Sequence, residues 1–255
     1  MAYSIGIDSG STATKGILLA DGVITRRFLV PTPFRPATAI TEAWETLREG
    51  LETTPFLTLT GYGRQLVDFA DKQVTEISCH GLGARFLEPA TRAVIDIGGQ
   101  DSKVIRLNED GSVKNFVMND KCAAGTGRFL EMMARTMEMS LDDMGKAGLS
   151  YKEDITISSM CTVFAESEVV SLIAQNKATD DIVHGLNKAV ASKTAALAKR
   201  VGGEERYMMT GGVSKNQGLV KTLEEKLGTT LVISDKAQLC GALGAALFAK
   251  DMVTE

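Results

Sequence analysis

The stretch 93–103, AVIDIGGQDSK, decides the fold, because the chain has already used the same pattern at 5–15, IGIDSGSTATK. In each copy an apolar run ends in an aspartate, glycine follows, and a short polar turn closes on a lysine. The matching residues are Asp8 and Asp96, Gly10 and Gly98, and Lys15 and Lys103. Each copy then continues through an apolar segment to an Asp-Gly pair. Such an internal repeat predicts two related structural halves.

Length and composition are compatible with that prediction. At 255 residues the chain is long enough for two modest domains. Apolar residues make up 44% and charged residues 24%, and no apolar run approaches the roughly 18 residues of a membrane span. A net charge of −4 and a pI near 5.4 argue against general nucleic-acid binding, because a phosphate backbone requires a basic face. We therefore expect no nucleic-acid or membrane partner. The first ten residues lack a basic segment and an apolar signal core, which predicts a cytoplasmic protein.

Hydrophobic periodicity predicts a β-meander that occurs twice. Strands are expected near 3–7, 16–20, up to Val30, 57–60, 93–97, 102–107, 112–118, 206–210 and 230–233. Helices are expected at 37–52, 64–71, 77–87, about 126–137, within 140–154, from near Thr162, and at 180–200, 216–227 and 241–250. Small residues on one face of 241–250 permit close packing on a neighbour or a ligand.

The repeated Asp-x-Gly turns are suited to phosphate binding. Glycine lets the backbone come close to a phosphate, consecutive N–H groups point into the turn, and the hydroxyls of Ser11, Thr12 and Thr14 add donors. Asp8 and Asp96 begin the turns, where carboxylates can hold the waters of a Mg²⁺ ion that contacts the phosphate. A single Asp-x-Gly is common at ordinary hairpin turns. Two copies in register, flanked by the same strands, favour a polyphosphate site.

Longer segments resemble a known superfamily. DSGSTATK (8–15) and IDIGGQDSK (95–103) are similar to the two phosphate motifs of the actin, sugar-kinase and chaperone ATPases, and MTGGVSKN (209–216) to their adenosine motif. Within that superfamily the chain resembles the activators of 2-hydroxyacyl-CoA dehydratases, which group with the ATPase subunits of benzoyl-CoA reductase (the BadF/BadG/BcrA/BcrD type), and most of all an enterobacterial branch. The segments that carry this narrower resemblance are GGQDSK, CAAGTGRFLE, CTVFAESEV and MTGGVSKN.

The resemblance implies an α/β fold of two duplicated actin-like, ribonuclease H-like domains with a nucleotide cleft between them. The first domain would be 1–90, with the C-terminal helix 241–255 packing back on it. The second would be 91–240 and would carry the adenosine pocket. ATP and Mg²⁺ are the implied cofactors.

Four cysteines in a reducing compartment are expected to be metal ligands, catalytic thiols or core residues rather than disulfides. In the family resembled, each subunit of a homodimer gives two cysteines to one 4Fe-4S cluster, and the motifs place these at Cys122 and Cys161. Both precede a predicted helix, whose positive end favours a thiolate. Their spacing alone is not a recognisable ligand motif, so two buried thiols remain the alternative. Cys79 and Cys240 lack such motif context and are interpreted as core thiols.

The second turn carries the residues that bear on mechanism. Phosphotransfer enzymes of the superfamily commonly place an acid there, whereas this chain has Gln100, which can orient water but is a poor base. Asp101 is the alternative acid, or it caps the turn. Lys15 and Lys103 either bridge phosphates or are solvated strand residues. The other predicted phosphate contacts are Gly99 and Ser102 in the second turn and Gly125, Thr126, Gly127 and Glu131 in the loop and helix after Cys122.

Gly211, Gly212, Val213 and Asn216 are the predicted adenosine contacts, although a Gly-Gly after a strand is often a plain turn. The implied function is ATP hydrolysis coupled to transfer of one low-potential electron. The electron would pass from a ferredoxin or flavodoxin, through the dimer's cluster, to an iron–sulfur dehydratase or reductase component. A small-molecule kinase of the same fold and a regulatory module without redox chemistry are the alternatives.

Overall fold

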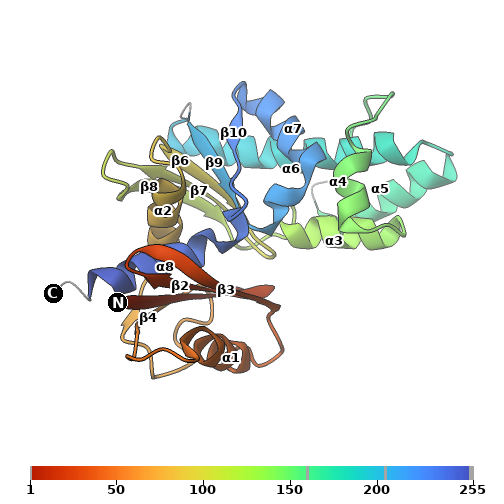
Figure 1. Ribbon diagram of the computed structural model, residues 1–255. Coiled ribbons are helices and arrows are strands. Elements are labelled where there is room, and N and C mark those ends of the chain that lie inside the picture. Colours follow the sequence, from red (N-terminus) through yellow and green to blue (C-terminus); the bar gives the residue numbers. More distant parts are fainter. Residues whose placement is uncertain (1, 159–160, 204–205, 253–255) are drawn as a thin grey trace. The chain divides into compact units, whose positions relative to one another are not determined.

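The computed structural model describes residues 2–158, 161–203 and 206–252, and it contains two five-stranded sheets (Figure 1). The chain divides into two compact units. Unit 1 comprises Met1–Thr91, Leu107–Lys114 and Ser234–Glu255, and unit 2 comprises Arg92–Arg106 and Asn115–Ile233. Unit 1 is therefore assembled from three separate stretches of chain.

The first sheet has the strand order β3-β2-β1-β4-β5. Its strands are β1 (Tyr3–Ser9), β2 (Ala13–Ala20), β3 (Val23–Pro31), β4 (Phe56–Thr60) and β5 (Lys72–Gln73). The first three form the antiparallel meander expected from the sequence, and β4 adds in parallel to β1. A parallel neighbour requires a crossover, which α1 (Pro36–Arg48) supplies.

The second sheet repeats this order as β8-β7-β6-β9-β10. Its strands are β6 (Ala93–Ile97), β7 (Ser102–Leu107), β8 (Val113–Asn119), β9 (Tyr207–Thr210) and β10 (Leu231–Val232). Here β6 pairs antiparallel with β7 and parallel with β9, as β1 does with β2 and β4. The registers also agree, because Asp8 is opposite Lys15 and Thr60, and Asp96 is opposite Lys103 and Thr210. The predicted duplicated actin-like fold is confirmed.

In unit 1 the sheet is covered on both faces. Along β1 and β2 the side chains alternate, so that Ile5, Ile7 and Leu18 pack with α1. On the other face Ile17 and Leu19 pack against α8 (Cys240–Asp251), which also lies against α2 (Glu76–Leu87). Successive side chains of each strand thus point to opposite faces of the sheet, as the predicted meander requires.

Helix α8 packs against its neighbours at backbone distance. A Cβ on Gly244 of α8 would overlap the carbonyl group of Cys79 in α2, and a Cβ on Gly6 of β1 would overlap the backbone at Ala246. Alanine at either glycine would therefore force the elements apart. The small residues of this helix serve packing on a neighbour, which was one of the two expected uses.

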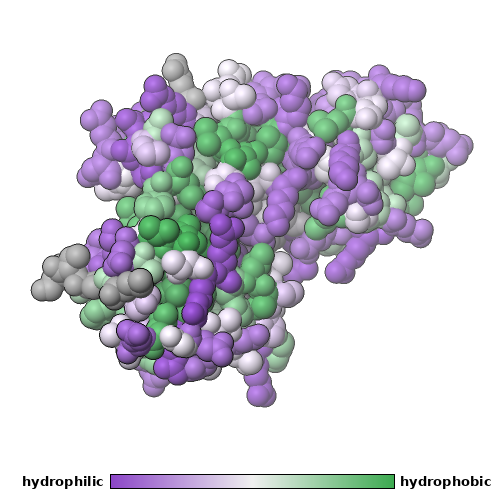
Figure 2. All heavy atoms as spheres, viewed as in Figure 1, coloured by the Kyte–Doolittle hydropathy of each residue, from purple (hydrophilic) through white to green (hydrophobic). Residues whose placement is uncertain are grey.

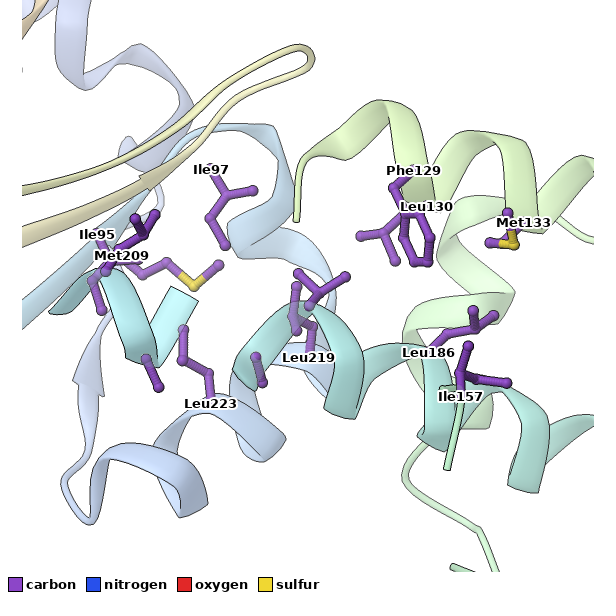
Figure 3. Packing of buried hydrophobic residues seen from close by; sticks show 14 of the residues in the cluster. Ile95, Ile97, Phe129, Leu130, Met133, Ile157, Leu186, Met209, Leu219 and Leu223 are labelled. Atoms are coloured by element: carbon purple, nitrogen blue, oxygen red, sulfur yellow. The ribbon is translucent and has the colours of Figure 1, made fainter. Parts of the chain in front are cut away.

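Unit 2 adds a helical layer to its sheet. Its elements are α3 (Gly127–Thr136), α4 (Leu141–Ala147), α5 (Thr162–Ala174), α6 (Thr179–Val201), the 3-10 turn η1 (Gly212–Lys215) and α7 (Gln217–Leu227). A second 3-10 turn, η2 (Ala237–Leu239), leads into α8 in unit 1. Figure 3 shows the core in which Ile95, Ile97 and Met209 of the sheet meet side chains of the helices. The hydroxyl of Thr136 donates to Glu166 Oε1 at 3.0 Å and connects α3 to α5.

The helix expected at 64–71 is wrong. This segment forms turns: Arg64 N and Leu66 N bond to carbonyls three residues back, and the chain on either side is held by strands. Gly63 N donates to Ser9 O at 3.0 Å and Asp71 N to Leu57 O at 3.1 Å. The other expected helices are present to within a few residues. Over the described ranges, no helix has both the length and the apolar character needed to cross a bilayer.

Candidate functional site

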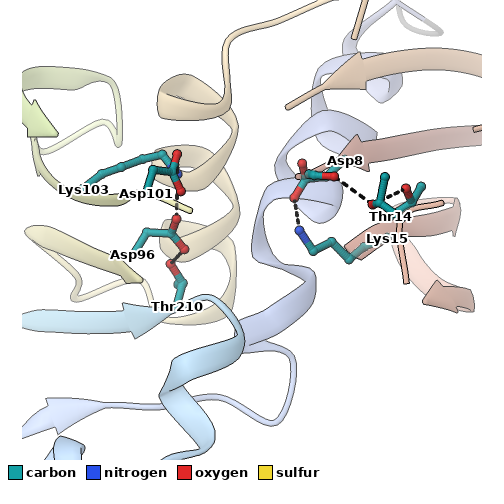
Figure 4. A network of polar contacts seen from close by, with 9 residues as sticks. Asp8, Thr14, Lys15, Asp96, Asp101, Lys103 and Thr210 are labelled. Carbon is teal, nitrogen blue, oxygen red and sulfur yellow. Dashed lines mark hydrogen bonds and ion pairs between the residues drawn. The ribbon is translucent and has the colours of Figure 1, made fainter. Parts of the chain in front are cut away.

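The first predicted phosphate turn connects β1 to β2 in unit 1. Asp8 ends the buried part of β1, and its Oδ2 lies 2.9 Å from Nζ of Lys15 on β2 (Figure 4). Gly10 N donates to Ala13 O at 3.1 Å and closes the turn. Because the strands are antiparallel with Asp8 opposite Lys15, the carboxylate and the ammonium group emerge on the same side of the sheet.

The second turn, in unit 2, has the same geometry. Oδ2 of Asp96 lies 2.9 Å from Nζ of Lys103, and Gly98 N donates to Asp101 O at 3.0 Å. This turn differs in one respect, because Oδ2 of Asp101 also lies 3.0 Å from the same ammonium group. Asp101 is thus held at the turn by its side chain and its backbone. Gln100 is exposed at the tip, and its side chain makes no hydrogen bond within the described residues.

Both lysines form ion pairs. The side chain of Lys103 is only 3% exposed, so for this residue the reading as a solvated strand residue is wrong. Lys15 is 16% exposed and offsets the charge of Asp8. Low dielectric strengthens these pairs, and each pair leaves little net positive charge for an anion. Phosphate binding by the two lysines remains a prediction.

A second duplicated element, which the sequence reasoning missed, contacts both aspartates. Thr60 ends β4 and Thr210 ends β9, and a glycine with positive φ follows each: Gly61 at +85° and Gly211 at +84°. A Cβ on Gly61 would overlap Oδ1 of Asp8, and one on Gly211 would lie 3.0 Å from Oδ1 of Asp96. The signal for this element is a Thr-Gly pair after each parallel strand. Two letters are too few to be distinctive without the strand register.

In unit 2 Thr210 supports its aspartate directly. Its Oγ1 donates to Oδ1 of Asp96 at 2.8 Å, while Lys103 occupies the other oxygen. Each carboxylate oxygen of this buried side chain therefore has a partner, and the carboxylate is fixed in orientation. Such fixed oxygens can orient the water shell of a divalent cation.

Several hydroxyl groups at the turns have no internal partner. The Oγ atoms of Ser9, Thr12 and Ser102 are buried and make no hydrogen bond within the described chain. Buried polar atoms without a partner are uncommon and usually bind water, an ion or a ligand. Ser11 lies beside them, partly exposed at the tip of the first turn. The residues present therefore fit a hydrated, phosphate-bearing ligand.

The predicted connecting loop lies against the second turn. Gly127 N donates to Gly98 O and Arg128 N to Gly99 O, both at 2.8 Å, so α3 begins on this turn. Thr126 is buried and donates its hydroxyl to Ala123 O. Gly125 has φ +86°. Glu131 pairs with Arg128 rather than projecting freely.

The predicted adenosine turn reaches the same place in unit 2. A Cβ on Gly127 would lie 3.3 Å from both Gly99 Cα and Val213 Cγ2, so these three segments converge. Gly212 begins η1, and Asn216 caps α7 by accepting from Leu219 N at 2.9 Å. The amide Nδ2 of Asn216 is buried without a partner in the described residues. The structure thus brings together the second turn, the connecting loop and the adenosine turn.

The four cysteines divide into two kinds. Cys79 and Cys240 are buried, as expected for core thiols, and desolvation by burial raises the pKa of Cys79 from 9.0 to about 12. Cys122 and Cys161 are exposed, and both belong to unit 2. The alternative of two buried thiols is therefore wrong for this second pair. Residues 159 and 160, which precede Cys161 in its motif, lie outside the described residues.

Cys161 is the N-cap of α5 and lies at the end of that helix where the backbone N–H groups are free. Cys122 lies in the loop before α3, and Asn119 fixes that loop by donating to Cys122 O at 2.8 Å. Within the described chain no group of three or more metal-ligating side chains is present. A cluster with four thiolate ligands would therefore need a second chain.

Helix α5 buries little of its apolar surface. Only Ala165 and Val169 are buried, whereas Val163 and Phe164 are 64% and 66% exposed. Val170 and Ile173 are exposed as well. Figure 2 shows apolar side chains at the surface over this helix. A helix that is apolar on several sides is normally buried, so this surface is suited to contact with another protein.

Two sheets with one strand order, each carrying an aspartate–lysine turn and a threonine–glycine turn, define the duplicated actin-like ATPase fold. The chain belongs to the BadF/BadG/BcrA/BcrD ATPase family, whose sequence profile matches residues 5–249. This confirms the family expected from the motifs.

Individual relatives agree with that assignment. The uncharacterized protein YjiL of Escherichia coli (strain K12) is 65% identical and aligns with 100% of this chain and 99% of its own length. The crystal structure of component A of (R)-2-hydroxyglutaryl-CoA dehydratase from Acidaminococcus fermentans gives a TM-score of 0.94 at 46% identity, covering 100% of both chains. The activator of the 2-hydroxyisocaproyl-CoA dehydratase from Clostridium difficile, with bound ADPNP, gives 0.92 at 42% identity, covering 99% of this chain and 96% of that one.

Proposed function

We propose that this ATPase couples ATP hydrolysis to the transfer of one low-potential electron to a partner dehydratase or reductase. The observation that carries the proposal is the division of its cysteines. The two in the family motifs are the exposed ones, and both lie in the same unit. Two relatives are described as a dehydratase component and a dehydratase activator, which supports the same role here.

Nucleotide binding follows from the two turns. In unit 1, Asp8 would hold waters of Mg²⁺, and Gly10, Ser11, Thr12 and Lys15 would contact phosphate. In unit 2, Asp96 would act as Asp8 does. The phosphate contacts there would be Gly98, Gly99, Ser102, Lys103, Gly125, Thr126, Gly127 and Glu131, and the adenosine contacts Gly211, Gly212, Val213 and Asn216. The partnerless hydroxyls of Ser9, Thr12 and Ser102 support this assignment, as does the ADPNP bound in a relative.

Hydrolysis by this site is expected to be slow. Gln100 is exposed at the tip of the second turn, where it can orient a water molecule but cannot accept its proton efficiently. The carboxylate of Asp101 is paired with Lys103 at 3.0 Å, so it is already engaged within the turn. This arrangement is better suited to a nucleotide switch than to rapid phosphotransfer, and it disfavours the kinase alternative.

Cys122 and Cys161 would hold half of a 4Fe-4S cluster, and a second copy of the chain would supply the other two thiolates. A bound cluster supplies a centre that accepts and donates single electrons. The exposed apolar side chains of α5, which begins at Cys161, would be covered in this homodimer. A regulatory module without redox chemistry would have no need for two exposed motif cysteines.

The proposed partners follow from the chemistry. The acceptor would be an iron–sulfur dehydratase or reductase component, and the donor a ferredoxin or flavodoxin. Binding of ATP would change the state of the turns from which α3 begins, and α3 is connected to α5 through Thr136 and Glu166. This chain of contacts gives nucleotide state a physical route to the segments that carry the cysteines.

The test is anaerobic purification with iron and sulfide analysis and a visible spectrum. We expect about four irons per dimer, since four thiolates bind one such cluster. Cys122→Ala and Cys161→Ala should each lose the iron, whereas Cys79→Ala, at a buried thiol, should retain it. A cluster-free wild-type protein after reconstitution, or full iron content in Cys161→Ala, would rule out the electron-transfer role.

A further inference from the structure

The turn after β4 and the turn after β9 are the same structure. Arg64 N donates to Gly61 O at 3.3 Å, and Ser214 N donates to Gly211 O at 3.3 Å. Both side chains also return to that carbonyl oxygen: Nη1 of Arg64 at 3.1 Å and Oγ of Ser214 at 2.8 Å. The duplication therefore extends from the phosphate turns to this second pair of turns, in which Arg64 and Ser214 make equivalent hydrogen bonds.

The two turns differ in the residue four positions after the threonine, which is Arg64 in the first turn and Ser214 in the second. The hydroxyl of Ser214 has a single proton, which Gly211 O accepts. The guanidinium of Arg64 has five N–H donors, and the bond to Gly61 O uses one of them. Within the described residues no carboxylate forms an ion pair with Arg64, and its side chain is only partly buried.

Arg64 is attached to the first phosphate turn from two sides. Gly63 N donates to Ser9 O at 3.0 Å, and Gly61 lies directly against the carboxylate of Asp8. Lys15 is paired with that carboxylate at 2.9 Å, so the pair has no formal net charge. Among the described residues of this turn, Arg64 is thus a cation without a paired carboxylate.

We propose that Arg64 binds the terminal phosphoryl group of the nucleotide. The inference rests on the proposed ATPase function and deepens it. Arg64 adjoins the first phosphate turn, whose Gly10, Ser11, Thr12 and Lys15 are the proposed phosphate contacts. Its counterpart Ser214 lies instead among the proposed adenosine contacts. Guanidinium presents paired donors that match phosphate oxygens.

This position gives Arg64 a defined part in hydrolysis. Water attacks the terminal phosphorus, the bond from phosphorus to the bridging oxygen breaks, and ADP leaves with the electron pair. The water oxygen becomes part of inorganic phosphate, and its protons pass to that phosphate and to solvent. Arg64 remains protonated throughout and stabilises negative charge on the terminal phosphoryl oxygens. Loss of one such charge-stabilising donor typically lowers kcat by roughly 10²–10³-fold.

The experiment compares Arg64→Gln and Arg64→Lys with Arg27→Gln, which changes an exposed arginine on β3 of the same unit. Steady-state ATPase assays give kcat and KM, and calorimetry gives the affinities for ADP and ADPNP. For Arg64→Gln we expect kcat to fall roughly 10²–10³-fold. ADPNP should bind more weakly, while the affinity for ADP should stay within about threefold of wild type because ADP lacks the terminal group. Arg64→Lys should recover part of kcat, and Arg27→Gln should match wild type.

The outcomes separate this inference from the function on which it rests. Equal kcat in Arg64→Gln and in an active wild-type enzyme would overturn the inference alone. Equal losses of ADP and ADPNP affinity in Arg64→Gln would also overturn it, because they would indicate a purely structural role at Gly61 O. A wild-type protein that neither binds nor hydrolyses ATP would overturn both. Urea midpoints of all variants establish that each is folded.

Discussion

Nζ of Lys103 lies 2.9 Å from Oδ2 of Asp96, and both side chains are 3% exposed. This ion pair is therefore buried, and its counterpart in the first turn, Lys15 with Asp8, has the same distance but a more exposed lysine. A buried pair is sensitive to the loss of one partner, because the remaining charge has no solvent around it.

Lys103→Met should therefore destabilise the nucleotide-free protein by about 3–5 kcal/mol, since Asp96 would be left buried without its cation. Urea unfolding monitored by circular dichroism measures this change. Lys121→Met is the matched control, because Lys121 is 89% exposed and pairs with Asp120 at the surface. Adding Asp96→Asn to Lys103→Met should restore part of the stability. Equal midpoints for the two lysine variants would contradict the burial argument.

Phe164→Glu should convert the proposed homodimer to a monomer. Phe164 is 66% exposed on α5, and a carboxylate there would have to be desolvated in any interface formed by this helix. Sedimentation velocity of the anaerobic protein gives the oligomeric state. Phe34→Glu is the control, since Phe34 is fully exposed in unit 1. Dimers of both variants, or dissociation of both, would show that α5 is not the interface.

The stability of the protein should fall at alkaline pH in a way that depends on Cys79. Desolvation by burial raises the pKa of this thiol from 9.0 to about 12. The unfolded chain therefore loses this proton at lower pH than the folded chain. The stabilising contribution of the neutral thiol is fully present below pH 9 and is lost as pH rises toward 12.

Chemical unfolding of wild type and Cys79→Ala between pH 8 and about 10.5 measures this effect. Wild type should lose stability more steeply than the variant above pH 9, the unperturbed pKa of the thiol. Parallel curves would mean that Cys79 ionises normally and that the helix packing around it admits water.

Gly61→Ala should be far more damaging than Gly50→Ala. Both glycines have positive φ, +85° and +69°, so each substitution carries the backbone strain of about 1–2 kcal/mol. Only Gly61 is crowded, because a Cβ there would overlap Oδ1 of Asp8 and lie 2.6 Å from Ser9 O. A Cβ added to Gly50 would have no atom within 4 Å. Thermal unfolding should therefore show a small shift for Gly50→Ala and a large one for Gly61→Ala, and similar shifts would refute the crowding.

The repeat made the two meanders and the matching positions of the aspartates and lysines accessible from the sequence, although the ion pairs between them were not expected. The alternation of side chains along each strand and the separation of Asp8 from Lys15 both lie within a short stretch of sequence. Antiparallel pairing of adjacent strands places such residues opposite each other. Gly211 was a predicted adenosine contact, but the contacts that Thr60–Gly61 and Thr210–Gly211 make with the aspartates were missed, for the opposite reason. They meet the aspartates through parallel pairing across a long crossover, which leaves only a two-residue signal.

The surface of α5 was also not predictable. The sequence of an apolar helix does not indicate whether its apolar face is covered by the same chain or by another protein. The segment 64–71 shows a further limit of local pattern. Gly63 N, just before it, and Asp71 N, at its end, bond to Ser9 O and Leu57 O, which are distant in sequence. Sequence periodicity does not report such competition for hydrogen bonds.

The packing of α8 has a consequence for biosynthesis. This helix follows the whole of unit 2 in the chain, yet its Leu243 and Ala246 complete the core beneath β2 in unit 1. A ribosome delivers β1 to β4 first and α8 after more than half of the chain has been made. Unit 1 must then wait, with one face of its sheet uncovered, while unit 2 is already able to fold. The order of completion is therefore the reverse of the order of synthesis, and the unfinished sheet is the part of the nascent protein most in need of a chaperone.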